Sequence, residues 1–370
     1  MKTRSLFCVL FLFCFSITAM FAQQHAPVRL GIAGLSHSHV HLLLKDLKRT
    51  DIQIVGIAES NRELAERYAK NYGFDPAIVY DSIEEMVEKT KPEGVLGFNS
   101  IYDHLQIVEV CAPKGIHVMV EKPLAVSVEH AARMAELSRK YGIMVLTNYE
   151  TTWYPSNHKA FDMVINQKAI GDIRKVIICD GHRGPKEINV NPEFLVWLTD
   201  PKLNGGGAVI DFGCYGANLM TWLMNNQRPI AVSATLQQIK PDVYPKVDDE
   251  ATIVVTYPKA QAIIQASWNW PVDRKDMEVY GVSGYVKALT GTDFSYRLTR
   301  ESPESMERLQ PLPAPENEPF GYFAKAIKGE LKVADSDLSS LANNLIVVEI
   351  LEAARNSAAA GKTIKLPARL

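Results

Sequence analysis

Residues 28–39, VRLGIAGLSHSH, decide the fold class of this chain. A short apolar run ends at a glycine, and small and polar residues follow it. This pattern predicts a buried β-strand that turns directly into a helix. Against the phosphate-binding pattern G-x-G-x-x-G only Gly34 is kept, because Ser36 and His39 stand at the other two glycine positions. The place of the turn after the first strand, more than its glycine content, therefore indicates a dinucleotide site.

Strand-like and helix-like patterns alternate from here to Asn148. Apolar runs typical of strands buried on both faces alternate with stretches of helical spacing. The expected strands are 28–34, 52–58, 94–98, 117–120 and 143–146, and the expected helices are 42–47, 62–72, 82–90, 105–114 and 129–141. Strand and helix in alternation predict a doubly wound parallel sheet, so we expect a Rossmann-type domain over residues 27–148.

Beyond residue 148 the strand-like runs lie closer together. They cover 174–180, 231–238, 251–257, 260–267 and 277–280. Runs without intervening helices predict a large, mostly antiparallel sheet and an α+β domain over residues 149–370. The proline-rich residues 303–319 are expected as a surface excursion, and residues 338–360 as a helix.

The first 22 residues have the pattern of a secretory signal peptide. Lys2 and Arg4 precede an apolar run, 6–15, and small residues lead to Ala22. The run is shorter than the ~20 residues of a membrane span, which disfavours the alternative of an anchor. We therefore expect cleavage after Ala22, export to a periplasm-like space, and no membrane attachment afterwards.

Charge and cysteine content exclude some classes of protein. The formal net charge of −2 lacks the basic excess of nucleic-acid-binding proteins. Outside the predicted signal peptide the cysteines are Cys111, Cys179 and Cys214, too few and too widely spaced for a disulfide framework or a CxxC metal site.

Strand ends on one sheet edge supply the candidate cofactor residues. Glu59 ends the second strand, where an acidic residue binds ribose hydroxyls, and this favours NAD over NADP. Arg62 keeps NADP possible. The candidates for cofactor binding are Gly34, Leu35, Ser36, His37, Glu59, Arg62, Asn99, His104, Glu121 and Lys122. A metal site at His37, His39 and His41 is the alternative for the turn, but no Cys or HExxH motif supports it, and we predict no metal.

Two further segments carry chemistry. Val120-Glu121-Lys122-Pro123 ends a parallel strand and brings Lys122 to the cofactor edge. Residues 205–218, GGGAVIDFGCYGAN, lead into a predicted helix on which Asp211, Tyr215 and Asn218 share one face, because they are spaced by four and three. The alternative is structural: a packed aromatic ring, a helix cap and a surface charge.

With these two segments the chain resembles the family of glucose-fructose oxidoreductase, inositol dehydrogenase and rhizopine catabolism proteins. Glu121-Lys122-Pro123 and the triple glycine before Asp211 are similar to its two signatures. The resemblance implies that Lys122 contacts nicotinamide and substrate, and that Asp211 and Tyr215 serve as acid and base. Tyr215 stands where histidine is common, and Asn218 replaces a second aspartate.

The mechanism that we expect is hydride transfer at a CH–OH group of a sugar or polyol, with a neighbouring group taking the hydroxyl proton. We expect Lys122 to lower the pKa of Tyr215, and which of the two holds the proton stays open. Candidate substrate contacts are Asn148, Trp153, His182, Arg183, Trp197 and Asn218.

Export adds a constraint on the cofactor. Free NAD(H) is not expected outside the cytoplasm, so we expect a tightly held cofactor that is recycled in place. A NAD-dependent glycoside hydrolase working by transient oxidation, and a non-catalytic carbohydrate-binding protein, are the alternatives. The resemblance also implies a homo-oligomer, a dimer or a tetramer.

Overall fold

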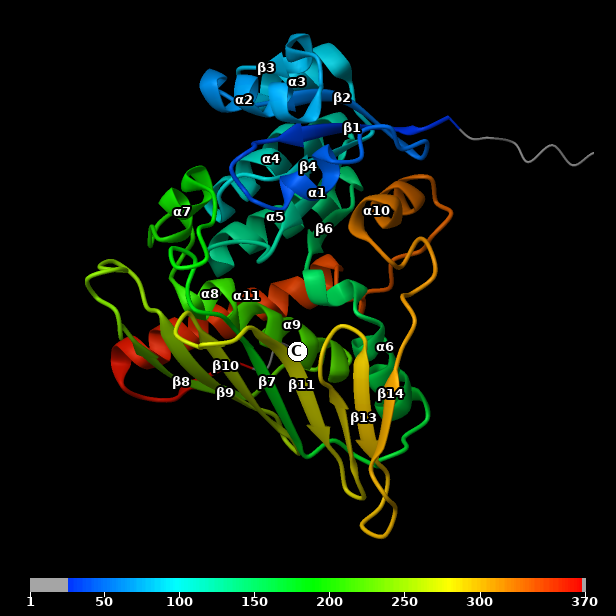
Figure 1. Cartoon of the computed structure of the whole chain (residues 1–370), viewed down its shortest axis with the longest axis vertical. Coiled ribbons are helices and arrows are strands. Elements are labelled where there is room, and N and C mark those ends of the chain that lie inside the picture. Colours follow the sequence, from blue (N-terminus) through cyan, green and yellow to red (C-terminus); the bar gives the residue numbers. More distant parts are fainter. Residues whose placement is uncertain (1–25, 368–370) are drawn as a thin grey trace, which may run out of the picture.

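The structure, a computed structural model, describes residues 26–367. It shows two bodies, each built on one sheet, with helices between them (Figure 1). The predicted signal peptide, residues 1–22, lies outside the described residues. Among the described helices, none is long and apolar enough to cross a membrane.

The first sheet has six strands in the order β3-β2-β1-β4-β5-β6, and every pairing is parallel. This confirms the doubly wound class. The strands are β1 (Val28–Ala33), β2 (Ile52–Ala58), β3 (Val79–Tyr80), β4 (Gly94–Gly97), β5 (His117–Glu121) and β6 (Val145–Asn148). Their carboxyl ends meet at one edge of the sheet, where a doubly wound fold binds its ligand.

Polar caps begin three helices of this body, and glycines end two of these. They are α1 (Val40–Leu44), α2 (Arg62–Tyr72), α3 (Ile83–Thr90), α4 (His104–Cys111) and α5 (Val128–Tyr141). Asn61, Ser82 and Ser127 accept hydrogen bonds from the first turns of α2, α3 and α5. Gly73 and Gly142 follow α2 and α5 with positive φ, the conformation that ends a helix at low cost in glycine.

A helix from the C-terminal half also covers the first sheet. Phe320 and Phe323, in α10 (Pro319–Ile327), are buried in the same apolar core as Leu30 of β1. Figure 1 shows α10 beside the parallel sheet, well away from β14, the strand that precedes it in the chain. The segment expected to lie wholly in the second body therefore contributes one helix to the first.

The second sheet has nine strands in the order β14-β13-β12-β11-β7-β10-β9-β8-β15, and only the β7–β10 pairing is parallel. The strands are β7 (Lys175–Gly181), β8 (Ala231–Gln237), β9 (Glu250–Thr256), β10 (Gln261–Ser267), β11 (Arg274–Tyr280), β12 (Tyr285–Ala288), β13 (Asp293–Arg297), β14 (Ser305–Arg308) and β15 (Ile364–Lys365). The mostly antiparallel sheet is confirmed. The proline-rich residues 303–319 are not a surface excursion over their whole length, because β14 within them pairs with β13.

Helices lie on the side of this sheet that faces the first body (Figure 1). They include α8 (Ala208–Asp211), α9 (Gly213–Leu223) and α11 (Leu341–Ala360), while α6 (Pro155–Phe161) and α7 (Pro192–Leu198) precede them in the chain. Between β7 and β8 the helix predicted after the triple glycine is present as α8 and α9, whereas α7 lies where no helix was expected. Short helical turns at Pro76–Ile78, Ile101–Asp103, Ala112–Lys114, Glu150–Trp153 and Asp162–Asn166 complete the described helical elements.

Steric contact explains why the last residue of the triple glycine, Gly207, cannot carry a side chain. A Cβ on Gly207 would lie 1.7 Å from the carbonyl oxygen of Asp248. The Asp248 carboxylate accepts hydrogen bonds from the N–H groups of Gly207 (2.8 Å) and Val209 (2.7 Å). These contacts fix the start of α8. The single helix expected after the glycines is broken at Phe212, so Asp211 ends α8 and Tyr215 lies in α9.

Candidate active site

A groove of about 600 Å³ runs along the carboxyl ends of the first strands, and Gly34, Ser36, Glu59 and Asn99 are among its lining residues. Gly34 has φ +81°, and a Cβ there would lie 2.7 Å from the Cβ of Asn99, so only glycine fits. The side-chain oxygen of Asn99 is buried without a hydrogen-bond partner. A buried acceptor without a partner beside a glycine turn fits a polar ligand such as a dinucleotide.

Glu59 and Arg62 are held by protein partners at this groove. The two carboxylate oxygens of Glu59 accept hydrogen bonds from the N–H groups of Leu35 (2.9 Å) and Asn61 (2.8 Å). Arg62 pairs with Asp81. Glu59 thus joins the end of β2 to the turn after β1, while the side chain of Leu35 is buried in the core.

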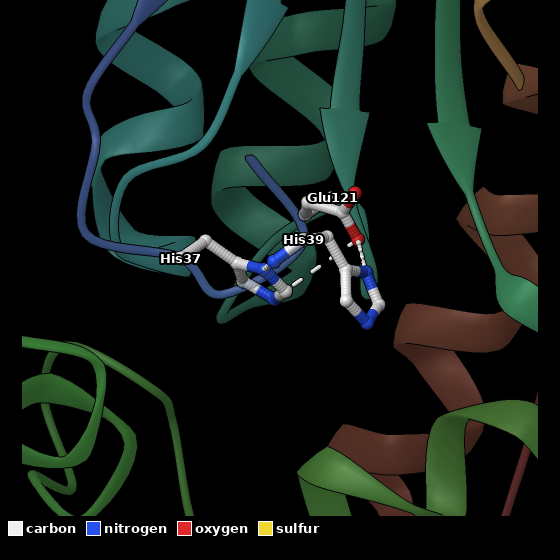
Figure 2. Close-up of side chains that lie close together, drawn as sticks. All are labelled: His37, His39 and Glu121. Carbon is white, nitrogen blue, oxygen red and sulfur yellow. Dashed lines mark hydrogen bonds and ion pairs between the residues drawn. The ribbon is translucent and has the colours of Figure 1, made fainter. Parts of the chain in front are cut away.

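His37 and His39 converge on Glu121 at the end of β5 (Figure 2). The Nδ1 atom of His39 lies 2.9 Å from the Glu121 carboxylate, and the Nε2 atom of His37 lies 4.0 Å from it. The other oxygen of Glu121 accepts a hydrogen bond from Asn148 (2.8 Å), whose own oxygen accepts from Trp153 (3.0 Å). Burial raises the pKa of Glu121, but both imidazoles and these hydrogen bonds outweigh burial and lower it to about 2.

The same three groups are close enough to bind a metal ion, with their candidate ligand atoms within 4.8 Å of one another. However, the Nδ1 atom of His37 accepts a hydrogen bond from the backbone N–H of His39 (3.1 Å). In a neutral imidazole this places the proton on Nε2, the atom that faces Glu121. A protonated nitrogen cannot ligate a metal, so the arrangement fits a hydrogen-bonded network better. His41 lies elsewhere, bonded to Tyr72 and Asn191.

Lys122 forms a buried ion pair with Asp211 across the two bodies. Its ammonium also donates a hydrogen bond to the backbone carbonyl of Asp211 (2.9 Å). The second carboxylate oxygen of Asp211 accepts from the indole N–H of Trp268 (3.0 Å). Burial acts to lower the pKa of Lys122, but the Asp211 carboxylate prevails and holds it above its ordinary value. Lys122 is therefore a charged donor at neutral pH.

Tyr215 does not have the environment that we expected. The Lys122 ammonium lies 5.1 Å from the centre of its ring, over the face, and Lys275 lies at 4.4 Å. Burial, together with Glu150 and Asp180, raises the pKa of Tyr215 well above its ordinary value. The expected lowering of this pKa was wrong, because cations over the ring face do not offset burial and two nearby acids. Tyr215 is a neutral phenol.

A second cavity, of about 560 Å³, opens beside the ion pair, and its lining includes His182, Phe212 and Lys275. The His182 ring packs edge-on against Phe212, with 4.8 Å between ring centres. Lys275 binds Glu150 (2.6 Å) and lies 3.9 Å from Asp180, and both acids also line the cavity. The cavity therefore combines an apolar wall with acids and a cation.

Three predicted site residues lie outside these groups, and a fourth, Trp197, packs against His37. His104 is fully buried, and its Nδ1 atom bonds the carbonyl of Leu124 (3.1 Å). Asn218 is also fully buried, and its amide donates a hydrogen bond to the backbone carbonyl of Leu338 (2.8 Å), which precedes α11 in the chain. Arg183 is exposed. Trp197 is buried against His37, with ring centres 5.6 Å apart.

Sequence reasoning missed Asp180, Glu150, Lys275 and Trp268. Asp180 had a signal, since it is an acidic residue that ends the apolar run Val176–Cys179. Lys275 had none, because only the pairing of β11 with β7 brings it opposite Asp180.

Family models match both bodies of the chain. Residues 28–149 match the oxidoreductase family with a NAD-binding Rossmann fold, and residues 158–287 match the GFO/IDH/MocA C-terminal domain. The trans-1,2-dihydrobenzene-1,2-diol dehydrogenase of Sus scrofa is 25% identical over 342 residues, which cover 89% of this chain and 96% of the relative.

Solved structures show the same fold at lower identity. The aldose-aldose oxidoreductase from Caulobacter crescentus, complexed with glycerol, has a TM-score of 0.76 and 21% identity, covering 92% of this chain and 100% of its own. An inositol dehydrogenase homolog from Azotobacter vinelandii, complexed with NAD+, has a TM-score of 0.77 and 18% identity, covering 93% and 98%. The parallel body of this chain is thus a NAD(P)-binding Rossmann domain.

Proposed function

Because the chain belongs to the GFO/IDH/MocA family of oxidoreductases, we propose that it transfers hydride at a CH–OH group of a sugar or polyol. One observation carries the proposal: the buried Lys122–Asp211 pair joins the carboxyl edge of the Rossmann sheet to the second body, and the Lys122 ammonium lies 5.9 Å from the centre of the ring of Phe212, which lines a polar cavity. A fixed cation beside a polar cavity suits the polarisation of a substrate oxygen.

The groove residues Gly34, Ser36, Glu59 and Asn99 would hold the dinucleotide, which supplies the hydride acceptor or donor when bound. Lys122 has three N–H donors, and the carboxylate and carbonyl of Asp211 take two. We propose that the third donates to a substrate oxygen. Asp211 keeps the ammonium charged and in place.

The walls of the second cavity support a hydroxyl-rich substrate. They place the acids Glu150 and Asp180 and the cation Lys275 beside the ring of Phe212. Polar groups bind hydroxyls, and an aromatic face packs on the C–H surface of a sugar ring. The diol and the aldose in the names of two similar proteins also carry CH–OH groups.

The test is to purify the chain without added cofactor, denature it and identify released NAD(H) or NADP(H) by mass spectrometry. We propose that the cofactor is retained, so a near-stoichiometric amount is expected. Lys122→Ala should abolish reduction of bound dinucleotide by sugars, whereas Lys259→Ala, at an exposed position, should not. A chain that neither retains nor binds a dinucleotide would contradict the proposal.

We also propose that residues 1–22 are a cleaved signal peptide and that the mature chain is a periplasmic homo-oligomer. The basic, apolar and small-residue pattern of the segment supports export. Mass spectrometry of the chain from a native host would show a start at Gln23, and light scattering would give the number of copies. An intact Met1 in the purified protein would contradict export by this route.

A further inference from the structure

Asp180 is a buried carboxyl group that the protein leaves without a hydrogen bond. It is 2% exposed, and neither carboxylate oxygen has a hydrogen-bond partner. Val176 and Ile178 of the same strand belong to the core under α9, so alternation places Asp180 on that face too. Its nearest cation is the Lys275 ammonium at 3.9 Å, on the residue directly opposite in β11.

Asp180 belongs to the wall of the cavity beside the ion pair. Asp180, His182 and Lys275 line it together with Phe212, which follows Asp211 directly. A buried polar group without a protein partner costs free energy unless a ligand or water satisfies it. The protein thus holds a free acid group at the place where the proposed substrate would bind.

Burial raises the pKa of Asp180 well above its ordinary value, although Lys275 and Lys122 oppose this. The carboxyl is therefore far easier to keep protonated than a surface aspartate. The charged and titratable groups that face it are Lys275 from β11, Lys122 after β5, Glu150 and Tyr154 after β6, Asp211 from α8, and Cys214 and Tyr215 from α9.

The other candidate groups are already engaged. Both carboxylate oxygens of Asp211 are bonded, to Lys122 and Trp268. Tyr215 keeps its proton, as shown above. His182 accepts a hydrogen bond from Gly184 at Nδ1 (2.9 Å), which leaves its other nitrogen protonated in the neutral ring.

We propose that Asp180 is the residue that exchanges a proton with the substrate hydroxyl in this cavity. The inference rests on the proposed function and adds the missing acid–base group to it. In oxidation the substrate C–H and O–H bonds break and a C=O bond forms; the hydride leaves to the dinucleotide, and the proton leaves to the carboxylate of Asp180. In the reverse direction protonated Asp180 returns the proton to the carbonyl oxygen. Lys275 stabilises the carboxylate form.

The test uses the mature chain loaded with NAD+ and three probes: D-glucose, D-xylose and myo-inositol. Single-turnover reduction is followed by nicotinamide absorbance between about pH 5 and about pH 10. Asp180→Asn keeps the shape and neutrality of the protonated acid, so we expect normal dinucleotide affinity. Reduction should be at least about 100-fold slower, and its rate should no longer rise with pH. Asp242→Asn, at an exposed position, is the matched control.

Lys275→Met gives a second, directional test. Loss of this cation would raise the pKa of Asp180 further, so the rising part of the pH profile should move to higher pH, whatever the height of its plateau. Reduction by Asp180→Asn within about threefold of wild type, or a rising part that stays in place in Lys275→Met, would overturn the inference.

Infrared spectroscopy tests the same carboxyl without turnover. Over the same pH range we expect a protonated-carboxyl band that fades as pH rises in wild type and in Asp242→Asn, is absent from Asp180→Asn, and is shifted by a bound sugar. Identical spectra for wild type and Asp180→Asn overturn the inference even in an enzyme active on a probe. A band that shifts with sugar supports it even where no probe is oxidised, which separates its failure from that of the proposed function.

Discussion

Glu121→Gln should destabilise the protein at neutral pH and much less in acid. The carboxylate of Glu121 is 2% exposed and is bonded to His39 and Asn148, with His37 at 4.0 Å. A glutamine keeps the shape of the protonated acid but not its charge. The substitution therefore measures what ionised Glu121 contributes to the fold.

The size of the effect follows from the pKa of this carboxyl, which is lowered from 4.5 to about 2. Each pKa unit corresponds to about 1.4 kcal/mol, so ionised Glu121 stabilises the folded state by about 3 kcal/mol at pH 7. A pKa that is lower in the folded state stabilises the fold above the unfolded value, and this stability is lost as pH falls toward the folded value. The difference between wild type and Glu121→Gln should thus shrink to about 1 kcal/mol at pH 3.

Urea unfolding followed by tryptophan fluorescence measures this difference, since Trp153 and Trp197 lie beside the cluster. Glu129→Gln, exposed on α5, is the control and should change the free energy of unfolding by no more than about 0.5 kcal/mol at any pH. A loss in Glu121→Gln that is the same at pH 7 and pH 3 would refute the reasoning, because the effect would then come from packing and not from charge.

Three further predictions test the site. Lys122→Met leaves its carboxylate partner buried and unpaired, so the free energy of unfolding should fall by about 3–5 kcal/mol in urea titrations. Gly34→Ala brings a Cβ within 2.7 Å of Asn99 at a positive φ and should weaken dinucleotide binding at least about tenfold by calorimetry; Gly73→Ala, where nothing lies within 4 Å, should leave the affinity unchanged. Tyr215→Phe should leave the pH midpoint of sugar oxidation in place, because the raised pKa of this phenol keeps it neutral; a shifted midpoint in stopped-flow measurements would contradict that.

Local patterns predicted the parallel body well. The strands of this body are mostly apolar, and α2 carries its own caps, Asn61 and Gly73, so residues 62–72 were predicted with the bounds that α2 has. The same local logic failed for α10. Its phenylalanines indicate that one face of the helix is buried, but not where. Only the folded structure shows that this face packs against Leu30 of the first body.

Site prediction failed where the electrostatic environment depends on tertiary pairing. Lys122 and Asp211 stand out in sequence motifs, and the fold brings them together. The pKa of Tyr215 could not be inferred, since its direction depends on Glu150 and Asp180, which approach from two other elements. The cross-strand contact of Asp180 with Lys275 depends on strand register, which no local spacing encodes.

The altered glycine turn changes how the cofactor edge is held together. Where the phosphate-binding pattern has its third glycine, this chain has His39, and its ring binds Glu121, the residue before Lys122. His37 faces the same carboxylate and also packs on Phe194 of α7 (4.7 Å between ring centres). The turn after β1, the end of β5 and a helix of the second body thus share one buried network. Because Lys122 follows Glu121 directly, the position of its ammonium depends on this network, so His39, which replaces the third glycine, helps to position the proposed catalytic lysine.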